Sequence, residues 1–262
     1  MFVSSTLSAV TPVKGIWMSF DESAVPSPPW RKRRKAAAAP QKPPLTRALV
    51  VDTALAILDQ EGLDGLSMRR VAHELNTGPA TLYAHVANKE ELLELAFDRV
   101  VAEIDMPAPD PDRWQDQIRQ VCLDTYRVLG RHSDIARVAL GKVPTGPNSL
   151  RVSDRMLAIL LAGGVPAQIA AWSLDRLYLY LSSDSFEGSI HLATQRATGM
   201  GMEEYYAKFV GDLRAFMSSL PPEHFPTLTA HVDEMTSGGG DERFLFGLDL
   251  LIQGIAAHAR KP

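Results

Sequence analysis

The sequence predicts an all-α protein in which two helical domains are joined by a shared helix. Apolar residues recur at three- and four-residue spacing in every periodic segment, and no segment alternates apolar and polar residues as a strand would. Residues 67–89 contain two short helical segments around a tight turn. The 262 residues are 45% apolar and 22% charged, a composition typical of a soluble chain with a sizeable core.

The first 42 residues differ in composition from the rest. Residues 1–42 hold seven Lys or Arg against two acidic residues, a balance of +5, whereas the remainder holds 20 against 29, a balance of −9. These residues are rich in Ser, Pro and Ala, so we expect a disordered basic extension. A first helix is predicted from Thr46 to Gln60, and Gly62 ends it.

The segment 67–89 has the signals of a helix-turn-helix. Ser67 is a favourable N-cap for the first of its helices. Asn76 follows that helix directly, and Asn tolerates the left-handed conformation that such a turn requires. Gly78 can cap the next helix, and Pro79 suits its first position. The second helix of such a hairpin can lie in the major groove of DNA.

The outward face of this second helix carries no charge, which favours the reading of bases. Leu82 and Val86 are predicted to point inward. Thr81 can donate or accept a hydrogen bond, and Ala80 can contact a thymine methyl group. The predicted phosphate contacts are Arg69, Tyr83, His85 and Lys89. The residues of this unit predicted to contact DNA are therefore Arg69, Pro79, Ala80, Thr81, Tyr83, His85 and Lys89.

The fourth helix is the clearest periodic segment. Asn88 can cap it three residues before Glu91, as in a capping box. The Pro-rich residues 106–111 then indicate a domain boundary, so the expected parts are a 1–42 extension, a 43–105 helix-turn-helix domain and a 106–262 helical domain. The apolar stripe of this helix consists of Leu92, Leu93, Ala96, Phe97, Val100, Val101 and Ile104.

The remainder of the chain is predicted to be helical. The segment Gly199–Gly201 and the run Gly238–Gly240 mark loops. Helices around 166–187 and 241–259 are apolar over more of their circumference than one buried stripe requires, so they are central or dimer-forming. Helices are expected over about 114–129, 134–140, 149–161, 166–187, 205–216 and 244–255.

The segment Thr-Leu-Tyr-Ala-His-Val-Ala-Asn-Lys-Glu-Glu-Leu, residues 81–92, resembles the DNA-binding domain of the TetR (tetracycline repressor) family. The run Phe244–Ile252, the Trp114-Gln-Asp segment and the region around Leu140-Gly resemble the ligand domain of tetracycline repressors. This resemblance covers nearly all of the chain after residue 45. It implies a homodimer held by a four-helix bundle, double-stranded palindromic operator DNA as partner, and release by a small-molecule inducer of unknown identity bound in each subunit.

The same resemblance argues against a tetracycline–magnesium ligand. Tetracycline repressors hold that ligand with histidines, an asparagine and a phenylalanine, and the matching positions here lie near Asp105, Ala139, Val121 and Thr125. An apolar pocket suits a hydrophobic or polycyclic compound instead. The residues expected to line it are Trp114, Ile118, Val121, Cys122, Thr125, Tyr126, Ala139 and Trp172, although several could equally be plain core residues.

A basic run precedes the first helix. Arg31, Lys32, Arg33 and Arg34 lie in the Pro- and Ala-rich extension, which can reach a neighbouring groove. Basic side chains on such an arm suit the narrow minor groove of A·T-rich DNA. The run is therefore expected to add DNA affinity, and the alternative is a solvated tail without a role.

Other chemistry is not indicated. A single cysteine, Cys122, excludes an internal disulfide, lies among apolar residues and fits the cytoplasm. No apolar run reaches the ~18–20 residues that cross a bilayer, so no membrane partner is expected. His73-Glu74 lacks a second histidine four residues on, and no metal or cofactor motif is found. Asp184 and Glu187 are expected to face solvent or a second subunit, and the alternative is acid–base catalysis.

The sequence therefore predicts a transcriptional regulator, a repressor rather than an enzyme. The alternative is an all-α ligand-binding protein, or an enzyme, that retains the hairpin as a scaffold. Salt-dependent binding to DNA from its own promoter region separates the two, because phosphate contacts release counterions.

Overall fold

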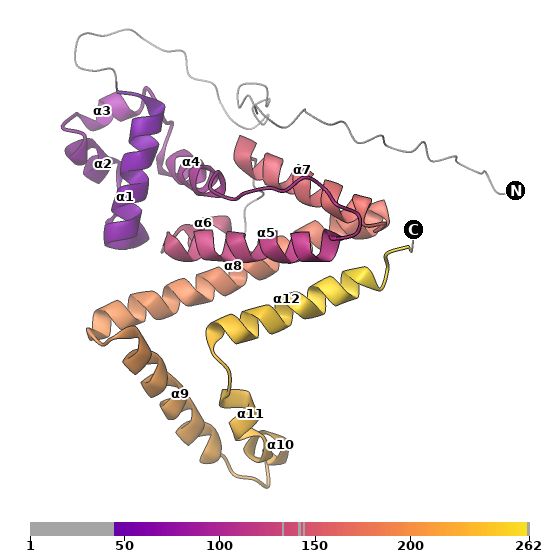
Figure 1. Cartoon of the computed structure of the whole chain (residues 1–262). Helices are drawn as coiled ribbons and strands as arrows, with labels where there is room; N and C mark the ends of the chain where they lie inside the picture. Colours follow the sequence, from indigo (N-terminus) through magenta and orange to yellow (C-terminus); the bar gives the residue numbers. More distant parts are fainter. Residues whose placement is uncertain (1–44, 133, 141–142, 144, 261–262) are drawn as a thin grey trace, which may run out of the picture. The chain divides into compact units, whose positions relative to one another are not determined.

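Helices form all the regular secondary structure within the described ranges, which are residues 45–132, 134–140, 143 and 145–260 of this computed structural model (Figure 1). The all-α prediction is confirmed. The helices are α1 Arg47–Gly65, α2 Met68–Glu74, α3 Pro79–Leu82, α4 Lys89–Val101, α5 Trp114–Arg131, α6 Ile135–Ala139, α7 Pro147–Ala162, α8 Ala167–Thr198, α9 Met202–Ser218, α10 Pro226–Ala230, α11 Val232–Thr236 and α12 Gly240–Ala256.

The turn between α2 and α3 forms as its residue types predict. The Ser67 hydroxyl accepts a hydrogen bond from the Arg70 N–H at 3.1 Å and caps α2. Asn76 has φ 48°, in the left-handed region, and Pro79 occupies the first turn of α3. Leu82 and Val86 are buried. The helix-turn-helix is therefore held by its caps and by one buried apolar side.

The ends of α1 and α4 hold this hairpin. Gly62 adopts φ 74° inside α1 and interrupts the helix there. At the start of α4, the Asn88 side chain accepts from the Glu91 N–H at 2.7 Å. The Glu91 carboxylate accepts from the Ala87 N–H at 2.6 Å and pairs with Arg47 at 2.6 Å. Asn88 thus caps α4, and Glu91 ties the start of α4 to the residue before the cap and to α1.

Helices α6, α7 and α12 pack around α5 and α8, whereas α10 and α11 pack on α9. Within the described residues, α5 contacts α7, α8 and α12, and α8 also contacts α6 and α7 (Figure 1). The Tyr126 ring of α5 stacks on Phe244 of α12 with centroids 4.0 Å apart, and Tyr180 of α8 stacks on the same ring at 5.5 Å. The Tyr180 hydroxyl donates to the Phe244 carbonyl at 2.8 Å. These three rings join α5, α8 and α12.

Helix α8 is longer than the sequence predicts, and the expected end near Glu187 is wrong. The helix continues to Thr198 and ends where Gly199 takes φ 70°. Gly188 lies inside the helix, where a glycine costs about 1 kcal/mol relative to alanine. Tertiary contacts oppose that cost: Ser189 is buried, and the His191 ring contacts Phe209 of α9 at a centroid distance of 4.8 Å.

Replacing Asn76 tests the turn. Asn76→Val places a β-branched residue at positive φ, so we expect the free energy of unfolding to fall by about 1–2 kcal/mol. Asn76→Gly, the matched control, accepts this conformation and should be close to neutral. Urea unfolding followed by circular dichroism measures both. Equal stability of the Val and Gly variants would contradict a turn that requires the left-handed conformation.

Candidate functional site

The outer face of α3 is exposed and free of charged side chains. Pro79, Ala80, Thr81 and Ala84 are exposed, and Tyr83 is 37% exposed at the end of the helix. The structure thus brings the predicted base-reading residues together on one surface. That surface presents the Thr81 hydroxyl and the Ala80 methyl group. Hydroxyl and methyl groups of this kind can contact base edges in a major groove.

The flanking cations differ in their availability. Arg69 is exposed on α2, whereas Arg70 pairs with Glu61 at 2.7 Å and with Glu74 at 2.6 Å. Lys89 is half-buried and donates to the Leu63 carbonyl at 3.3 Å, so it also holds the end of α1 to the start of α4. Arg69 is therefore the freer of the two predicted phosphate-binding cations.

The other predicted DNA contacts lie beside this face or outside the described residues. His85 is half-buried in the turn that follows α3, where its backbone N–H donates to the Leu82 carbonyl. The basic run Arg31, Lys32, Arg33 and Arg34 falls outside the described residues.

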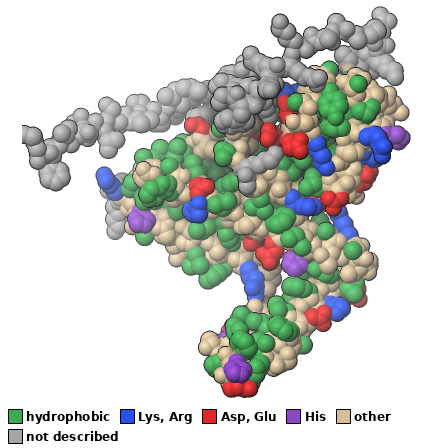
Figure 2. All heavy atoms as spheres, turned by 180° about the vertical axis from the view of Figure 1, so that it is seen from behind, with side chains coloured by type: hydrophobic (Ala, Val, Ile, Leu, Met, Phe, Trp, Pro, Cys, Tyr) green, Lys and Arg blue, Asp and Glu red, His purple; other side chains and the backbone are tan. Residues whose placement is uncertain are grey.

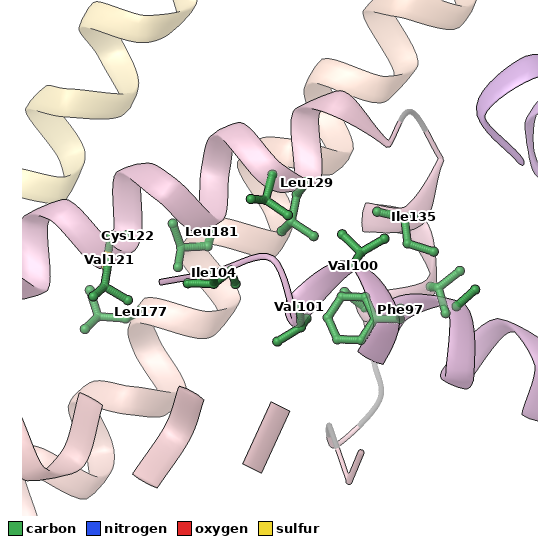
Figure 3. Close-up of a cluster of buried hydrophobic side chains, with 14 of the residues drawn as sticks. Phe97, Val100, Val101, Ile104, Val121, Cys122, Leu129, Ile135, Leu177 and Leu181 are labelled. Carbon is green, nitrogen blue, oxygen red and sulfur yellow. The ribbon is translucent and has the colours of Figure 1, made fainter. Parts of the chain in front are cut away.

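A small cavity of about 70 Å³ lies where α4, α5, α7 and α8 meet. It is smaller than pockets for drug-sized ligands, which measure ~300–1,000 Å³, so such a ligand has to displace side chains. Figure 3 shows Phe97, Val101 and Ile104 beside Leu129 and Leu181. The cavity is lined by Phe97, Val101, Ile104, Thr125, Leu129, Ser149, Val152, Ser153, Met156, Leu174, Tyr178, Leu181 and Ser182.

The cavity wall is apolar and its hydroxyl groups are already bonded. None of the described residues that line it is charged. The Thr125 and Ser153 hydroxyls each donate to the carbonyl four residues earlier, at 2.7 and 2.9 Å. The Tyr178 hydroxyl donates to the Ala139 carbonyl at 2.7 Å, and burial raises the Tyr178 pKa. Such a wall favours a ligand that gains affinity by burying apolar surface.

The residues predicted for the pocket from α5 lie mostly elsewhere. Thr125 lines the cavity, whereas Ile118, Val121 and Cys122 are almost completely buried and lie outside its lining. Trp114 packs against the end of α7, where a Cβ on Gly163 would lie 2.2 Å from its ring. These side chains fill the core around the first half of α5, and their contact with a ligand stays a prediction. Burial raises the pKa of the Cys122 thiol to about 12, consistent with the packed thiol expected from the sequence.

Three further predicted pocket residues occupy different surroundings. Tyr126 stacks on Phe244. Ala139 is not a lining residue, but its carbonyl accepts a hydrogen bond from Tyr178, which is one. Trp172 is 63% exposed and lines a groove between α8 and α12, so it does not belong to this cavity. The sequence pattern could not separate these roles, because helical periodicity marks a buried side chain whether it faces a gap or a neighbour.

The groove between α8 and α12 is an exposed apolar surface. It measures about 330 Å³, and Ile169, Trp172, Leu250 and Leu251 are among its lining residues. Leu250 is 55% exposed. Hydrophobic side chains are also exposed on the lobe of α9, α10 and α11, at the bottom of Figure 2. Large exposed apolar patches mark interaction surfaces.

A half-buried carboxyl lies beside the Tyr126 ring. Burial, together with the nearby charges of Glu187 and Asp241, raises the pKa of Asp184 to about 6. Asp184 also raises the pKa of Tyr126, after the larger effect of burial. The folded chain holds this proton more tightly than the unfolded chain does. The free energy of unfolding therefore falls as pH rises from about 4 to 6.

Asp184→Asn is therefore expected to raise the melting temperature more at pH 7.5 than at pH 5.0. The amide removes a buried charge that is present at the higher pH, while at pH 5.0 the folded wild type already holds the proton. Thermal melts of both proteins at the two pH values measure the difference. The same increment at both values would show that Asp184 titrates as an ordinary exposed carboxyl.

The chain matches two family descriptions. Residues 106–259 match "Tetracyclin repressor-like, C-terminal domain", and residues 50–96 match "Bacterial regulatory proteins, tetR family". Within the described ranges, no helix combines the length and apolar character that spanning a bilayer requires.

Similar proteins have names that state their roles. The HTH-type transcriptional repressor DrrR1 of Streptomyces coeruleorubidus is 30% identical over 227 residues, which cover 86% of this chain and 82% of that protein. The TetR family protein ActR of Streptomyces coelicolor, solved in complex with actinorhodin, is 40% identical with a TM-score of 0.75. That likeness covers 84% of this chain and 99% of ActR. The class D tetracycline repressor of Escherichia coli is 29% identical, over 80% of this chain and 88% of that protein.

Proposed function

The chain belongs to the tetR family of bacterial regulatory proteins and is a ligand-responsive, DNA-binding transcriptional regulator, and from this we propose that it represses transcription at a palindromic operator and leaves it when an apolar ligand binds. The uncharged exposed face of α3 carries this proposal, because it presents base-reading groups beside the exposed Arg69. The similar regulators support a regulatory role in place of an enzymatic one.

The operator-bound form is proposed to be a homodimer. A helix-turn-helix reads a palindrome as a pair, one recognition helix in each half-site. Proteins of this family act as dimers, and the exposed apolar groove between α8 and α12 offers a matching surface for a second copy. Pairing two such faces would produce a four-helix bundle and cover Trp172 and Leu250.

The ligand is proposed to be a hydrophobic or polycyclic compound that occupies the cavity between α4, α5, α7 and α8. Its uncharged wall and bonded hydroxyls support an apolar ligand. The structure of ActR with actinorhodin supplies a first compound to test.

The protein is proposed to act in the cytoplasm, where its operator lies. The run Arg31–Arg34 stays a predicted accessory arm for the minor groove.

The two DNA-contact roles can be separated by substitution. Thr81→Ala should cost about 1–3 kcal/mol at the preferred operator and blur base preference, because it removes a base-reading hydroxyl. Arg69→Ala should weaken binding to all sequences similarly and reduce the salt slope by roughly one unit, because it removes a phosphate contact. Titrations of promoter-region DNA at two salt concentrations measure both. Identical specificity profiles for the two variants would contradict this division.

Filling the cavity should prevent ligand binding. Val152 lines the cavity, so Val152→Phe is expected to weaken actinorhodin binding at least tenfold. Leu161→Phe is the control, since Leu161 lies on the same helix, is exposed and is not a lining residue. Fluorescence titration measures both affinities. Tight magnesium-dependent tetracycline binding, or equal effects of the two substitutions, would contradict the proposed site.

A further inference from the structure

Asp98 of α4 caps the N-terminus of α7. One carboxylate oxygen accepts from the Ser149 N–H and the Ser149 hydroxyl, both at 2.9 Å. The other accepts from the Asn148 N–H at 3.2 Å and the Asn148 amide at 3.0 Å. Asp98 is only 6% exposed, and its two partners are buried as well. We call these four hydrogen bonds the Asp98 cap.

The backbone around the Asp98 cap leaves no spare room. A Cβ on Gly146 would lie 2.1 Å from an Asp98 oxygen, so glycine is required there. Two more residues of α7 bind the segment that follows α4. Arg151 donates to the Ile104 carbonyl at 3.3 Å, and Arg155 donates to the Pro107 carbonyl at 3.2 Å. Helix α7 is therefore hydrogen-bonded both to the end of α4 and to the segment that follows it, over residues 98–107.

The Asp98 cap adjoins the ligand cavity. Ser149 lines the cavity and also supplies two of the four hydrogen bonds to Asp98. On α4, Phe97 and Val101 line the same cavity on either side of Asp98 in sequence. A ligand that separates the α4 wall from the α7 wall would pull Ser149 away from Asp98.

The other end of α4 is fixed to the helix-turn-helix. Lys89 bonds to the carbonyl of Leu63, and Glu91 bonds to the N–H of Ala87 and to Arg47. Arg99, next to Asp98, pairs with Asp52 of α1 at 3.1 Å. A shift of α4 relative to α7 is thereby passed to the DNA-reading helices.

We propose that Asp98 and Ser149 are the positioning residues through which the cavity controls the operator affinity of the helix-turn-helix. In the ligand-free chain the Asp98 cap fixes α4 against α7, and with it the position of α3. Ligand binding opens the cap and releases α4. This inference rests on the proposed function, since it concerns how the proposed cavity acts on the proposed DNA-binding surface.

The chemistry of the cap favours two discrete arrangements over a graded one. A buried carboxylate and two helix N–H groups are all satisfied when the cap is closed. Partial separation would leave them without hydrogen bonds and shielded from water, which is costly. The chain therefore closes the cap fully or opens it far enough to admit water or ligand. Breaking the cap by substitution should populate the open arrangement without ligand.

Two substitutions outside the cavity lining break the cap. Asp98→Asn keeps the side-chain size but turns an NH₂ group toward the donors of α7. Gly146→Ala places a methyl group against the carboxylate. Each should lower affinity for promoter-region DNA about three- to tenfold without ligand. Amide exchange at Asn148 and Ser149 should accelerate in both. Leu150→Ala is the matched control, because Leu150 lies on the same helix beside Ser149, is 41% exposed and belongs neither to the cavity lining nor to the Asp98 cap.

Ligand affinity distinguishes a positioning role from a merely structural one. If the cap couples the two sites, Asp98→Asn and Gly146→Ala should bind actinorhodin more tightly while binding operator more weakly. Simple destabilisation would weaken both. Unchanged operator affinity in the two variants, or a parallel loss of both affinities, would overturn the proposal. If instead wild-type protein fails to bind promoter DNA, the proposed function fails, and the exchange rates still report whether Asp98 holds α7.

Discussion

Helix α4 belongs to two packing units at once, and the rest of the structure depends on that constraint. Its first turn is tied to α1 and to the loop after α3 by Glu91 and Lys89. Its last turns supply Phe97 and Val101 to the cavity and the Asp98 carboxylate to α7. Since the two ends belong to one helix, a displacement of its last turns would also move its first turn and the contacts made there.

Local sequence signals were sufficient to predict the helix-turn-helix. Ser67, Asn76, Pro79 and Asn88 act through bonds or backbone angles within a few residues, so their roles do not depend on distant parts of the chain. The exposed face of α3 followed from helical periodicity alone. Where tertiary contacts compete with propensity, the same reasoning failed: α8 passes through Gly188 because its second half packs on α6 and α9.

The cavity could not be derived in this way. Its walls come from four helices, and Phe97, Val101 and Leu181 have the same apolar periodicity as fully packed neighbours. Resemblance to tetracycline repressors directed attention to α5, of which Thr125 lines the cavity while Ile118 and Cys122 fill the core. The Asp98 cap was equally hidden, because a carboxylate 50 residues from its partner has no signature in a single sequence.

The internal hydrogen bonds of the cavity hydroxyls bear on how such a protein changes over evolutionary time. Thr125 and Ser153 donate to carbonyls that already belong to helical hydrogen-bonding patterns. Replacing either hydroxyl by a methyl group or a hydrogen leaves no buried donor or acceptor stranded. These positions of the lining can therefore change at little thermodynamic cost, so the shape and polarity of the cavity can vary while the scaffold and its connection to α4 persist.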